Sequence, residues 1–557
     1  MNTGDTAWVL ISAGLVMFMT PGLALFYGGM VRAKSVLNVM ATTFACLAVV
    51  GVVWLLYGYS LAFGGDAFGG LIGGLHDAGL HGLASRLVGA GGHRIPLFAF
   101  AAFQLMFAII TVALLAGAAA ERTRFWPWLL FVVAWVTVVY LPLAHWVFDA
   151  PGLTGPHSTG GWMAGKLHLL DFAGGTAVEV NSGAASLAVA VVLGRRRHWP
   201  KEPARPHNLP LVMLGSGVLW FGWFGFNAGS ALGANVVAAT SFLNTMIAGG
   251  TGMIGWLVVE QWRDGKPTTL GAASGVVAGL VGITPACAFV EPLGGAAIGL
   301  IAGAVAALAV GLKYKLGYDD SLDVVAVHGV GGLTGLLLIG LFATTAVNPR
   351  GADGLFYGGG TGQLWRQAVA ALATMGYSAI LTFVIGWLIN KTVGLRVDAE
   401  AEWDGIDEAE HAESAYEFGS LGHGHAPGFG AGLARQRAAA RRAPGSGLSR
   451  AKLAFPAGRR ARGHNRPLRL RKEPLCEERG AGMRLSVIRG IAYEFPWFHR
   501  WMGAIGNTCF VIGSVFFLFK GLVYPGTWIF ILASLGMMID SFGEKLVKYE
   551  ERRRQAP

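Results

Sequence analysis

The chain has 557 residues, of which 54% are apolar and only 13% are charged. A soluble chain of this length carries about 25% charged residues, so the composition excludes an ordinary soluble globular protein. Long apolar runs recur, each near the roughly 20 residues that span a bilayer as a helix, whereas a membrane β-barrel shows short alternating segments. We therefore expect an all-α polytopic membrane protein.

The formal net charge of +11 is concentrated near the C-terminus. Residues 435–489 contain sixteen Lys or Arg and three Glu, so the rest of the chain carries a net charge of −2. The cysteines show no pairing pattern, and most of them fall in or near apolar segments, where a small buried hydrophobic residue is the expected role. They are Cys46, Cys287, Cys476 and Cys509.

Apolar run length predicts eleven membrane spans before residue 392. They cover residues 8–31, 37–63, 97–120, 125–148, 172–194, 209–232, 239–261, 268–288, 293–312, 325–346 and 364–390.

Lys and Arg are concentrated in every second connection between these spans. Because Lys and Arg accumulate on the cytoplasmic side, this pattern predicts an N-terminus outside the cell and a cytoplasmic end for the eleventh span. We expect a multi-pass protein of the inner (plasma) membrane. The basic connections are residues 32–34, 122–124, 195–205, 263–266 and 313–315.

Two distant segments share one sequence frame. Residues 171–183 read DFAGGTAVEVNSG and residues 323–332 read DVVAVHGVGG. When they are aligned, Glu179 and His328 occupy the same position. This correspondence indicates an internal duplication, and transporters built from inverted repeats place the substrate path where the repeats meet.

An ionisable group at the centre of a bilayer costs at least about 2.5–3.5 kcal/mol, so Glu179 and His328 are candidates for a functional pair. A buried pair with a purely structural role is the alternative. Asp171 and Asp323 precede the fifth and tenth spans, where a carboxylate can cap a helix. Further candidates are the aromatic residues Phe103, Phe107, Trp223 and Phe226, which could also be plain core residues.

Six motifs, taken together and in order, identify a known family. They are MTPGLALFYGGMVRAKSVLN, FQLMFAIIT, DFAGGTAVEVNSG, GWFGFNAGSA, GLVGITPACAFV and DVVAVHGVGG. Through them, residues 1 to about 418 resemble the ammonium transporter family (Amt/Mep/Rh). The resemblance implies an eleven-helix fold with an inverted repeat and a homotrimer in which every protomer has its own narrow pore for ammonium or ammonia.

The resemblance also implies roles for individual residues. Phe107 and Phe226 would form a phenylalanine gate, and the family's paired-histidine site would map onto Glu179 and His328. Ammonium recruitment would use Phe107, Phe148, Ser230 and Asp171. From their positions in the spans rather than from the resemblance, Trp223, Phe103 and Asp323 are candidates for lining or supporting the pore, with helix packing as the alternative.

Two positions depart from the usual family pattern. Glu179 stands where most bacterial members have His, as in some fungal permeases. Phe148 stands where Trp is usual, and its ring lacks the indole N–H. We therefore expect a weaker recruitment site and a distinct pH dependence.

Elementary chemistry supports transport with deprotonation. Aromatic rings hold a cation by about 0.5–2 kcal/mol, but an apolar pore rejects the hydrated ion. Neutral ammonia can cross if Glu179 and His328, titrating as a coupled pair, carry the proton. The alternatives are an ammonium sensor that signals through its C-terminal extension and a channel for another neutral gas. No nucleophile–base set, phosphate loop or metal cluster is evident in the sequence, so we expect no enzyme, cofactor or metal site.

Composition divides the chain into four parts. Residues 1–391 are the membrane domain, and residues 392–420 resemble the family's cytoplasmic regulatory segment, which can bind a PII-type protein. Residues 421–490 are expected to be a basic disordered linker facing anionic lipid, without a platform for nucleic acid; His423 and His425 there could touch a metal. Residues 491–557 resemble a YrhK-like domain and predict a two-helix transmembrane hairpin, which would be an anchor or accessory element.

Overall fold

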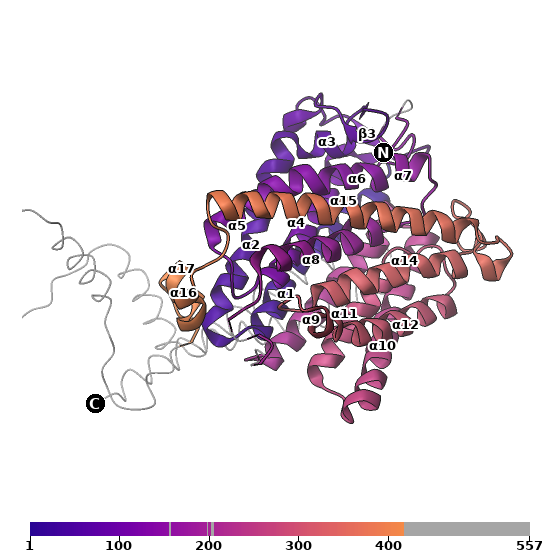
Figure 1. The fold of residues 1–557 in the computed structure, drawn as a ribbon. Coiled ribbons are helices and arrows are strands. Elements are labelled where there is room, and N and C mark those ends of the chain that lie inside the picture. Colours follow the sequence, from indigo (N-terminus) through magenta and orange to yellow (C-terminus); the bar gives the residue numbers. More distant parts are fainter. Residues whose placement is uncertain (155–157, 198, 202–204, 417–557) are drawn as a thin grey trace, which may run out of the picture. The chain divides into compact units, whose positions relative to one another are not determined.

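The computed structural model describes residues 1–154, 158–197, 199–201 and 205–416 (Figure 1). The predicted linker and YrhK-like hairpin lie outside the described residues.

The first half of the membrane domain consists of long helices, two of which continue through a short π-helical segment. The elements are α1 (Thr3–Met30), η1 (Ala33–Ser35), α2 (Val36–Val53), η2 (Trp54–Gly58), α3 (Tyr59–Phe63), η3 (Ala78–Leu80), α4 (Leu97–Ala119), α5 (Phe125–Trp135), η4 (Val136–Tyr140), α6 (Leu141–Phe148), α7 (Trp162–Gly165), η5 (Gly175–Val180) and α8 (Asn181–Leu193).

The second half continues with helices of the same kind and ends in two short helices. The elements are α9 (Leu209–Gly229), α10 (Val236–Asp264), α11 (Thr269–Ile283), α12 (Pro292–Ala309), α13 (Leu312–Leu316), η6 (Val325–Val330), α14 (Gly331–Phe342), η7 (Leu355–Tyr357), α15 (Gly362–Thr392), α16 (Ala399–Asp404) and α17 (Ile406–His411).

Within the described residues, ten helical stretches are long and apolar enough to cross a membrane. The eighth predicted span is a helix too, but α11 has only 15 residues and its apolar run ends in turns. The all-helical prediction missed two short antiparallel ladders in the connection between α3 and α4. There, β1 (Asp66–Ala67) pairs with β2 (Ile72–Gly73), and β3 (Leu87–Val88) pairs with β4 (Ile95–Pro96).

Side chains just before the helices explain where several of them begin. Asn2, Asn208, Asn235, Thr268 and Asp398 each accept a hydrogen bond from a backbone N–H in the first turn of α1, α9, α10, α11 and α16. These N–H groups have no partner within the helix, so a side-chain oxygen at this position stabilises the start of the helix.

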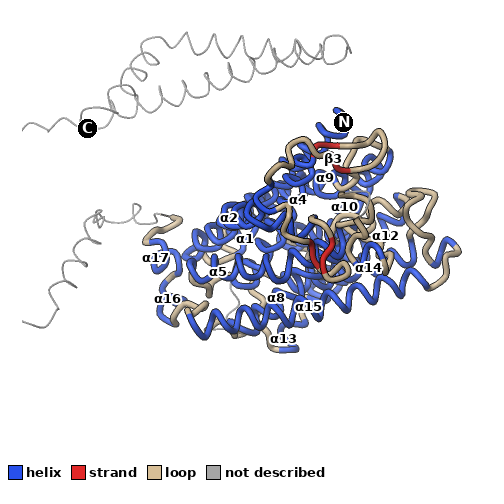
Figure 2. The backbone as a smooth tube through the Cα atoms, turned by 90° about the horizontal axis from the view of Figure 1, so that it is seen from above, coloured by secondary structure: helices blue, strands red, loops and turns tan. Residues whose placement is uncertain are grey.

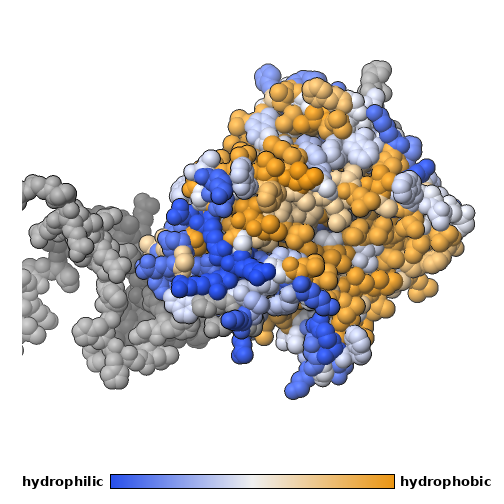
Figure 3. All heavy atoms as spheres, viewed as in Figure 1, coloured by the Kyte–Doolittle hydropathy of each residue, from blue (hydrophilic) through white to orange (hydrophobic). Residues whose placement is uncertain are grey.

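The helices of the two halves interleave, with α1 packed on α9 and the long helix α15 lying along α8 (Figures 1 and 2). On the face drawn in Figure 3, apolar residues form a broad area. Large apolar side chains on α10 and α15 point outward, including Val258, Leu372 and Ile380, which are 60%, 69% and 64% exposed. An exposed apolar belt of this kind suits contact with lipid or with other helices.

The segment after α15 is tied to the membrane domain by carboxylates. Asp407 accepts hydrogen bonds from the backbone N–H groups of Leu37 and Asn38 (3.0 and 2.8 Å), at the start of α2. Glu410 accepts one from the N–H of Phe125 (2.9 Å), the first residue of α5. Two carboxylates of α17 thus cap two helices of the first half.

A candidate conduction site between the repeated helices

The two ionisable residues of the repeat meet inside the bundle. Glu179 lies in the π-helical segment η5 and His328 in the corresponding segment η6. The Glu179 Oε2 and His328 Nδ1 atoms are 2.6 Å apart, and the residues are 1% and 4% exposed. The duplication frame read from the sequence therefore corresponds to direct contact between the two side chains.

Glycines let the two repeated helices approach closely enough for this contact. A Cβ atom on Gly183 would lie 2.1 Å from the Cα atom of Gly329, and one on Gly332 would lie 2.6 Å from the Cβ atom of Glu179. Any larger residue would push the backbones apart. The glycines therefore set the distance across which Glu179 and His328 form their hydrogen bond.

Asp171 organises the start of η5. Its Oδ1 accepts hydrogen bonds from the N–H groups of Gly174 (2.8 Å) and Gly175 (2.7 Å), and its Oδ2 accepts one from Thr176 (2.6 Å). The predicted capping role of Asp171 is confirmed, and the cap fixes the backbone that carries Glu179.

The second repeat is capped by Asp320, which the sequence analysis missed. Its Oδ2 accepts from the N–H of Val325 (2.7 Å), five residues on, in the same frame as Asp171 in the first repeat. The prediction that Asp323 caps the tenth span is wrong, because Asp323 instead forms an ion pair with Lys313 (2.7 Å). Continuing the alignment three residues upstream would have identified Asp320.

The predicted gate phenylalanines are stacked on each other. The ring centroids of Phe107 and Phe226 are 4.2 Å apart, with an angle of 20° between the planes, and both residues are 1% exposed. Phe148 and Phe103 meet Phe107 edge-on at 5.8 and 4.9 Å. The four rings thus form one packed aromatic cluster.

Ser230 and Trp223 flank the stacked rings. The Ser230 hydroxyl is half-buried and donates to the carbonyl oxygen of Phe226 (2.8 Å). The Trp223 indole N–H donates to the hydroxyl of Thr284 (2.8 Å), which in turn donates to the carbonyl of Leu280. Thr284 thus holds the Trp223 ring in place.

A small cavity lies between the stacked rings and the ionisable pair. Glu179, His328, Phe226 and Trp223 all line it. Its volume is about 20 Å³, room for roughly one molecule of the size of water. Sequence reasoning missed the remaining lining residues because apolar side chains in a membrane helix carry no positional signal: Met19, Leu23, Phe26, Ile110, Leu114, Val178, Leu219 and Val277.

The geometry allows a specific chemistry. A small weak acid that enters the cavity finds apolar walls everywhere except at Glu179 and His328, which share a short hydrogen bond of 2.6 Å. Hydrogen bonds between an ionised carboxylate and an imidazolium are short and strong. In both protonation states of the imidazole, Nδ1 can donate to the Glu179 carboxylate, so the carboxylate keeps a hydrogen-bond partner when the pair gains or loses a proton.

Comparisons with known proteins agree with this arrangement. The model of the "Ammonium Transporter Family" matches residues 7–416, and that of the "YrhK-like protein" family matches residues 493–548. The resemblances inferred from the motifs are thereby confirmed for both parts of the chain.

Two bacterial relatives share much of the sequence. An ammonium transporter of Mycobacterium tuberculosis is 56% identical over 436 residues, covering 74% of this chain and 90% of the relative. An ammonium transporter of Bacillus subtilis is 48% identical over 419 residues, covering 75% of this chain and 99% of the relative.

Solved structures share the fold. Saccharomyces cerevisiae Mep2 is 35% identical with a TM-score of 0.65, covering 72% of this chain and 88% of Mep2. A structure described as a "Sensor Amt Protein" is 29% identical with a TM-score of 0.66, covering 73% of this chain and 98% of that protein.

Proposed function

Because the chain belongs to the ammonium transporter family, we propose that it recruits ammonium at an aromatic vestibule, deprotonates it and conducts ammonia through the bundle. The observation that carries this proposal is the contact between Glu179 and His328 at one end of an otherwise apolar cavity.

Recruitment would take place on the outer side of the stacked rings. Phe107 and Phe148 offer ring faces or edges there, and Ser230 offers a hydroxyl oxygen. Asp171 would act indirectly, by holding the backbone of η5. Passage requires Phe107 and Phe226 to move apart, because the stacked pair leaves no opening.

Deprotonation removes the electrostatic obstacle to passage. A cation without partners at the centre of a bilayer costs at least about 2.5–3.5 kcal/mol, whereas neutral ammonia fits an apolar cavity. The released proton would pass along Glu179 and His328, which link the two repeats. With Glu in place of the usual His, the deprotonated pair carries one negative charge, and a single shared proton neutralises it. Its pH response should therefore differ from that of two imidazoles.

Electrophysiology on the reconstituted full chain tests this role. Glu179→Ala should abolish ammonium currents or uncouple them from proton movement, because the relay loses one member. Glu179→His should keep conduction but shift its pH dependence. Currents of unchanged size, selectivity and pH profile in both variants would overturn the relay.

A measurement of ammonium flux distinguishes a transporter from the alternative, an ammonium sensor. One structural relative carries "sensor" in its description, while the bacterial relatives with higher identity are described as transporters. Expression in a strain deficient in ammonium uptake should restore growth on low ammonium. Ammonium binding without growth rescue or flux would favour the sensor.

The same proposal covers the oligomeric state, the membrane orientation and the C-terminal parts of the chain. The protein would be a homotrimer in the inner membrane with its N-terminus outside, and the segment from residue 392 would face the cytoplasm, where a PII-type protein could bind. The contacts of Asp407 and Glu410 with the starts of α2 and α5 support a regulatory role for this segment. The YrhK-like part would serve as a membrane anchor or accessory element.

A further inference from the structure

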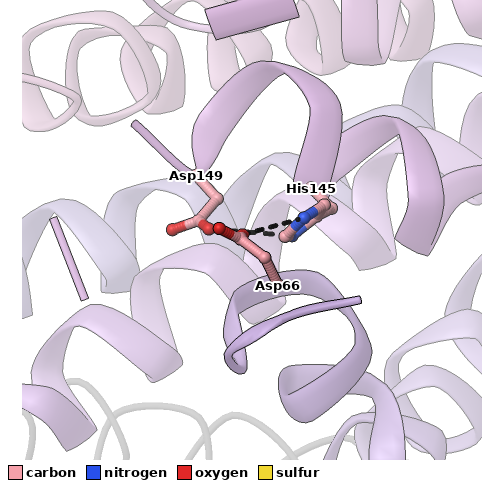
Figure 4. Close-up of side chains that lie close together, drawn as sticks. All are labelled: Asp66, His145 and Asp149. Carbon is pink, nitrogen blue, oxygen red and sulfur yellow. Dashed lines mark ion pairs between the residues drawn. The ribbon is translucent and has the colours of Figure 1, made fainter. Parts of the chain in front are cut away.

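A second cluster of ionisable side chains lies apart from the conduction site. Asp66, His145 and Asp149 point toward one another (Figure 4), and one ligand atom of each lies within 4.8 Å of the others. Asp66 comes from β1, His145 from the last turn of α6, and Asp149 directly follows α6. Sequence reasoning expected no metal site, because about eighty residues separate Asp66 from the other two.

The hydrogen bond of His145 defines which ring nitrogen is free. Its Nδ1 lies 2.9 Å from the carbonyl oxygen of Ala62. A carbonyl only accepts, so Nδ1 carries the proton and the lone pair of the neutral ring is on Nε2. A backbone carbonyl that fixes the imidazole in this way is the usual support of a metal-binding histidine.

The free nitrogen faces another acceptor. The His145 Nε2 lies 3.4 Å from the Asp66 Oδ1, and both atoms are buried without a hydrogen-bond partner. The His145 side chain itself is 0% exposed. Two unpartnered acceptors this close repel each other unless a proton or a metal cation lies between them.

Their separation also suits a shared metal ion. Two ligands that each lie 2.0–2.1 Å from a tetrahedral zinc ion are about 3.3 Å apart, close to the observed 3.4 Å. The second carboxylate oxygen of Asp66 is held by the N–H of Thr159 (2.7 Å) and by its hydroxyl, which leaves Oδ1 directed at the imidazole.

Asp149 adds a third ligand with unused capacity. It is 0% exposed, its Oδ2 lies 3.7 Å from the His145 Nδ1, and its carboxylate accepts long hydrogen bonds of 3.4 Å from Thr154 and Ser158. A buried carboxylate with such long hydrogen bonds is compensated for its lost hydration when it coordinates a cation.

We propose that Asp66, His145 and Asp149 bind a divalent transition-metal cation. The imidazole favours zinc and similar ions over calcium or magnesium, which prefer all-oxygen sites. Three protein ligands would leave a fourth position for water, on the side where Asp66 is 14% exposed. The ion would join β1 to the end of α6 and so fix Phe148, which precedes Asp149 and meets the ring of Phe107.

Zinc content and thermal unfolding of the purified full chain test the site. All proteins carry His423→Ala and His425→Ala, so that the histidines of the linker do not bind the probe. After chelation and re-addition of Zn²⁺, we expect about one retained ion per chain and a higher unfolding midpoint. Asp66→Asn and His145→Gln should each lose the retained ion and the zinc-dependent rise.

The matched control is His81→Ala, which removes an exposed imidazole from the connection that also contains Asp66. It should retain zinc like the parent. If His145→Gln does not fold, Asp66→Asn at the more exposed edge decides the result. Equal zinc content in parent and variants, or a midpoint that falls by the same amount with and without zinc, would show an ion pair only and overturn the proposal.

Discussion

At the scale of single residues, the contact between Glu179 and His328 depends on neighbouring glycines as much as on the two ionisable side chains. Gly183 and Gly332 carry no Cβ, and this absence allows Glu179 to reach His328. Separating a buried pair is costly, because removing one partner from a buried charge typically destabilises a protein by about 3–5 kcal/mol. Small changes in helix spacing should therefore affect both stability and transport.

Gly183→Ala tests this dependence. The added methyl group would lie 2.1 Å from the Gly329 Cα, so we expect a loss of about 1–3 kcal/mol in the free energy of unfolding. Ammonium flux into proteoliposomes should fall by about tenfold or more, as expected when catalytic or binding groups are displaced by an ångström.

The control is Gly217→Ala in α9, where a Cβ atom would meet nothing within 4 Å. It should leave flux unchanged and stabilise the helix by up to about 1 kcal/mol. Normal flux in Gly183→Ala would show that the helix spacing has no part in conduction.

At the scale of elements, η5 and η6 are built alike. Each is a π-helical segment that continues into an α-helix. The backbone N–H groups at the start of each segment donate hydrogen bonds to an aspartate, Asp171 for η5 and Asp320 for η6. π-Helical turns are rare and occur often at functional sites. Each cap fixes the turn that carries the ionisable residue, and we therefore expect it to act on transport through the backbone.

Asp320→Ala should therefore act on the second repeat as Asp171→Ala acts on the first. We expect each to lower the free energy of unfolding by about 0.5–2 kcal/mol and to reduce ammonium flux. Asn235→Ala removes the cap of α10 and should cost similar stability, but leave flux per folded protein unchanged. If all three variants transport equally well per folded protein, the caps are structural only.

The segment of α16 and α17 is a separate element whose attachment can be tested. Asp407→Ala removes two hydrogen bonds to the start of α2. We expect faster proteolytic cleavage between residues 398 and 416, because buried hydrogen bonds oppose local opening. Glu408→Ala, on an exposed neighbour in α17, is the control and should be cut at the parental rate; equal rates in both variants would contradict the prediction.

At the scale of the whole molecule, an ion network joins the two halves. Arg196 contacts Glu121 (2.8 Å) and Asp319 (2.9 Å). Arg32 also contacts Glu121 (3.0 Å), and Arg122 contacts Asp319 (3.5 Å). Both carboxylates are almost fully buried. Arg32 follows α1, Glu121 follows α4 and Asp319 precedes η6, so the network connects the ends of α1 and α4 with the start of the second repeat.

This network predicts acid sensitivity. Burial alone would raise the pKa of Glu121 and of Asp319, but the neighbouring arginines outweigh it and lower both values. Carboxylates with a lowered folded pKa stabilise the protein above their unfolded pKa of about 4, and this stability is lost as the pH falls through the folded values. The unfolding midpoint should thus drop steeply below about pH 4.

Glu121→Gln should have a lower midpoint at neutral pH and a shallower decline in acid. Asp264→Asn provides the contrast, because Asp264 is also paired with an arginine but is exposed. Exposed pairs contribute little, so its profile should match the parent. A parental slope in Glu121→Gln would exclude the network as the source of acid sensitivity.

The sequence allowed the helical segments to be predicted, because apolar runs of bilayer length depend only on local composition. It also revealed the Glu179–His328 correspondence, since the duplication left a readable frame. It did not reveal the ladders β1–β4, the capping role of Asp320 or the aliphatic cavity wall. These depend on packing between distant segments, as does the cluster of Asp66, His145 and Asp149.

The π-helical turns at η5 and η6 also limit how the chain can change in length. A π turn holds about one residue more than an α turn, and one residue corresponds to about 100° of rotation around a helix. Deleting a residue ahead of Glu179 would turn its carboxylate away from His328, while the same deletion in both halves would turn both. Substitutions at these two positions are therefore easier to accommodate than insertions or deletions just before them.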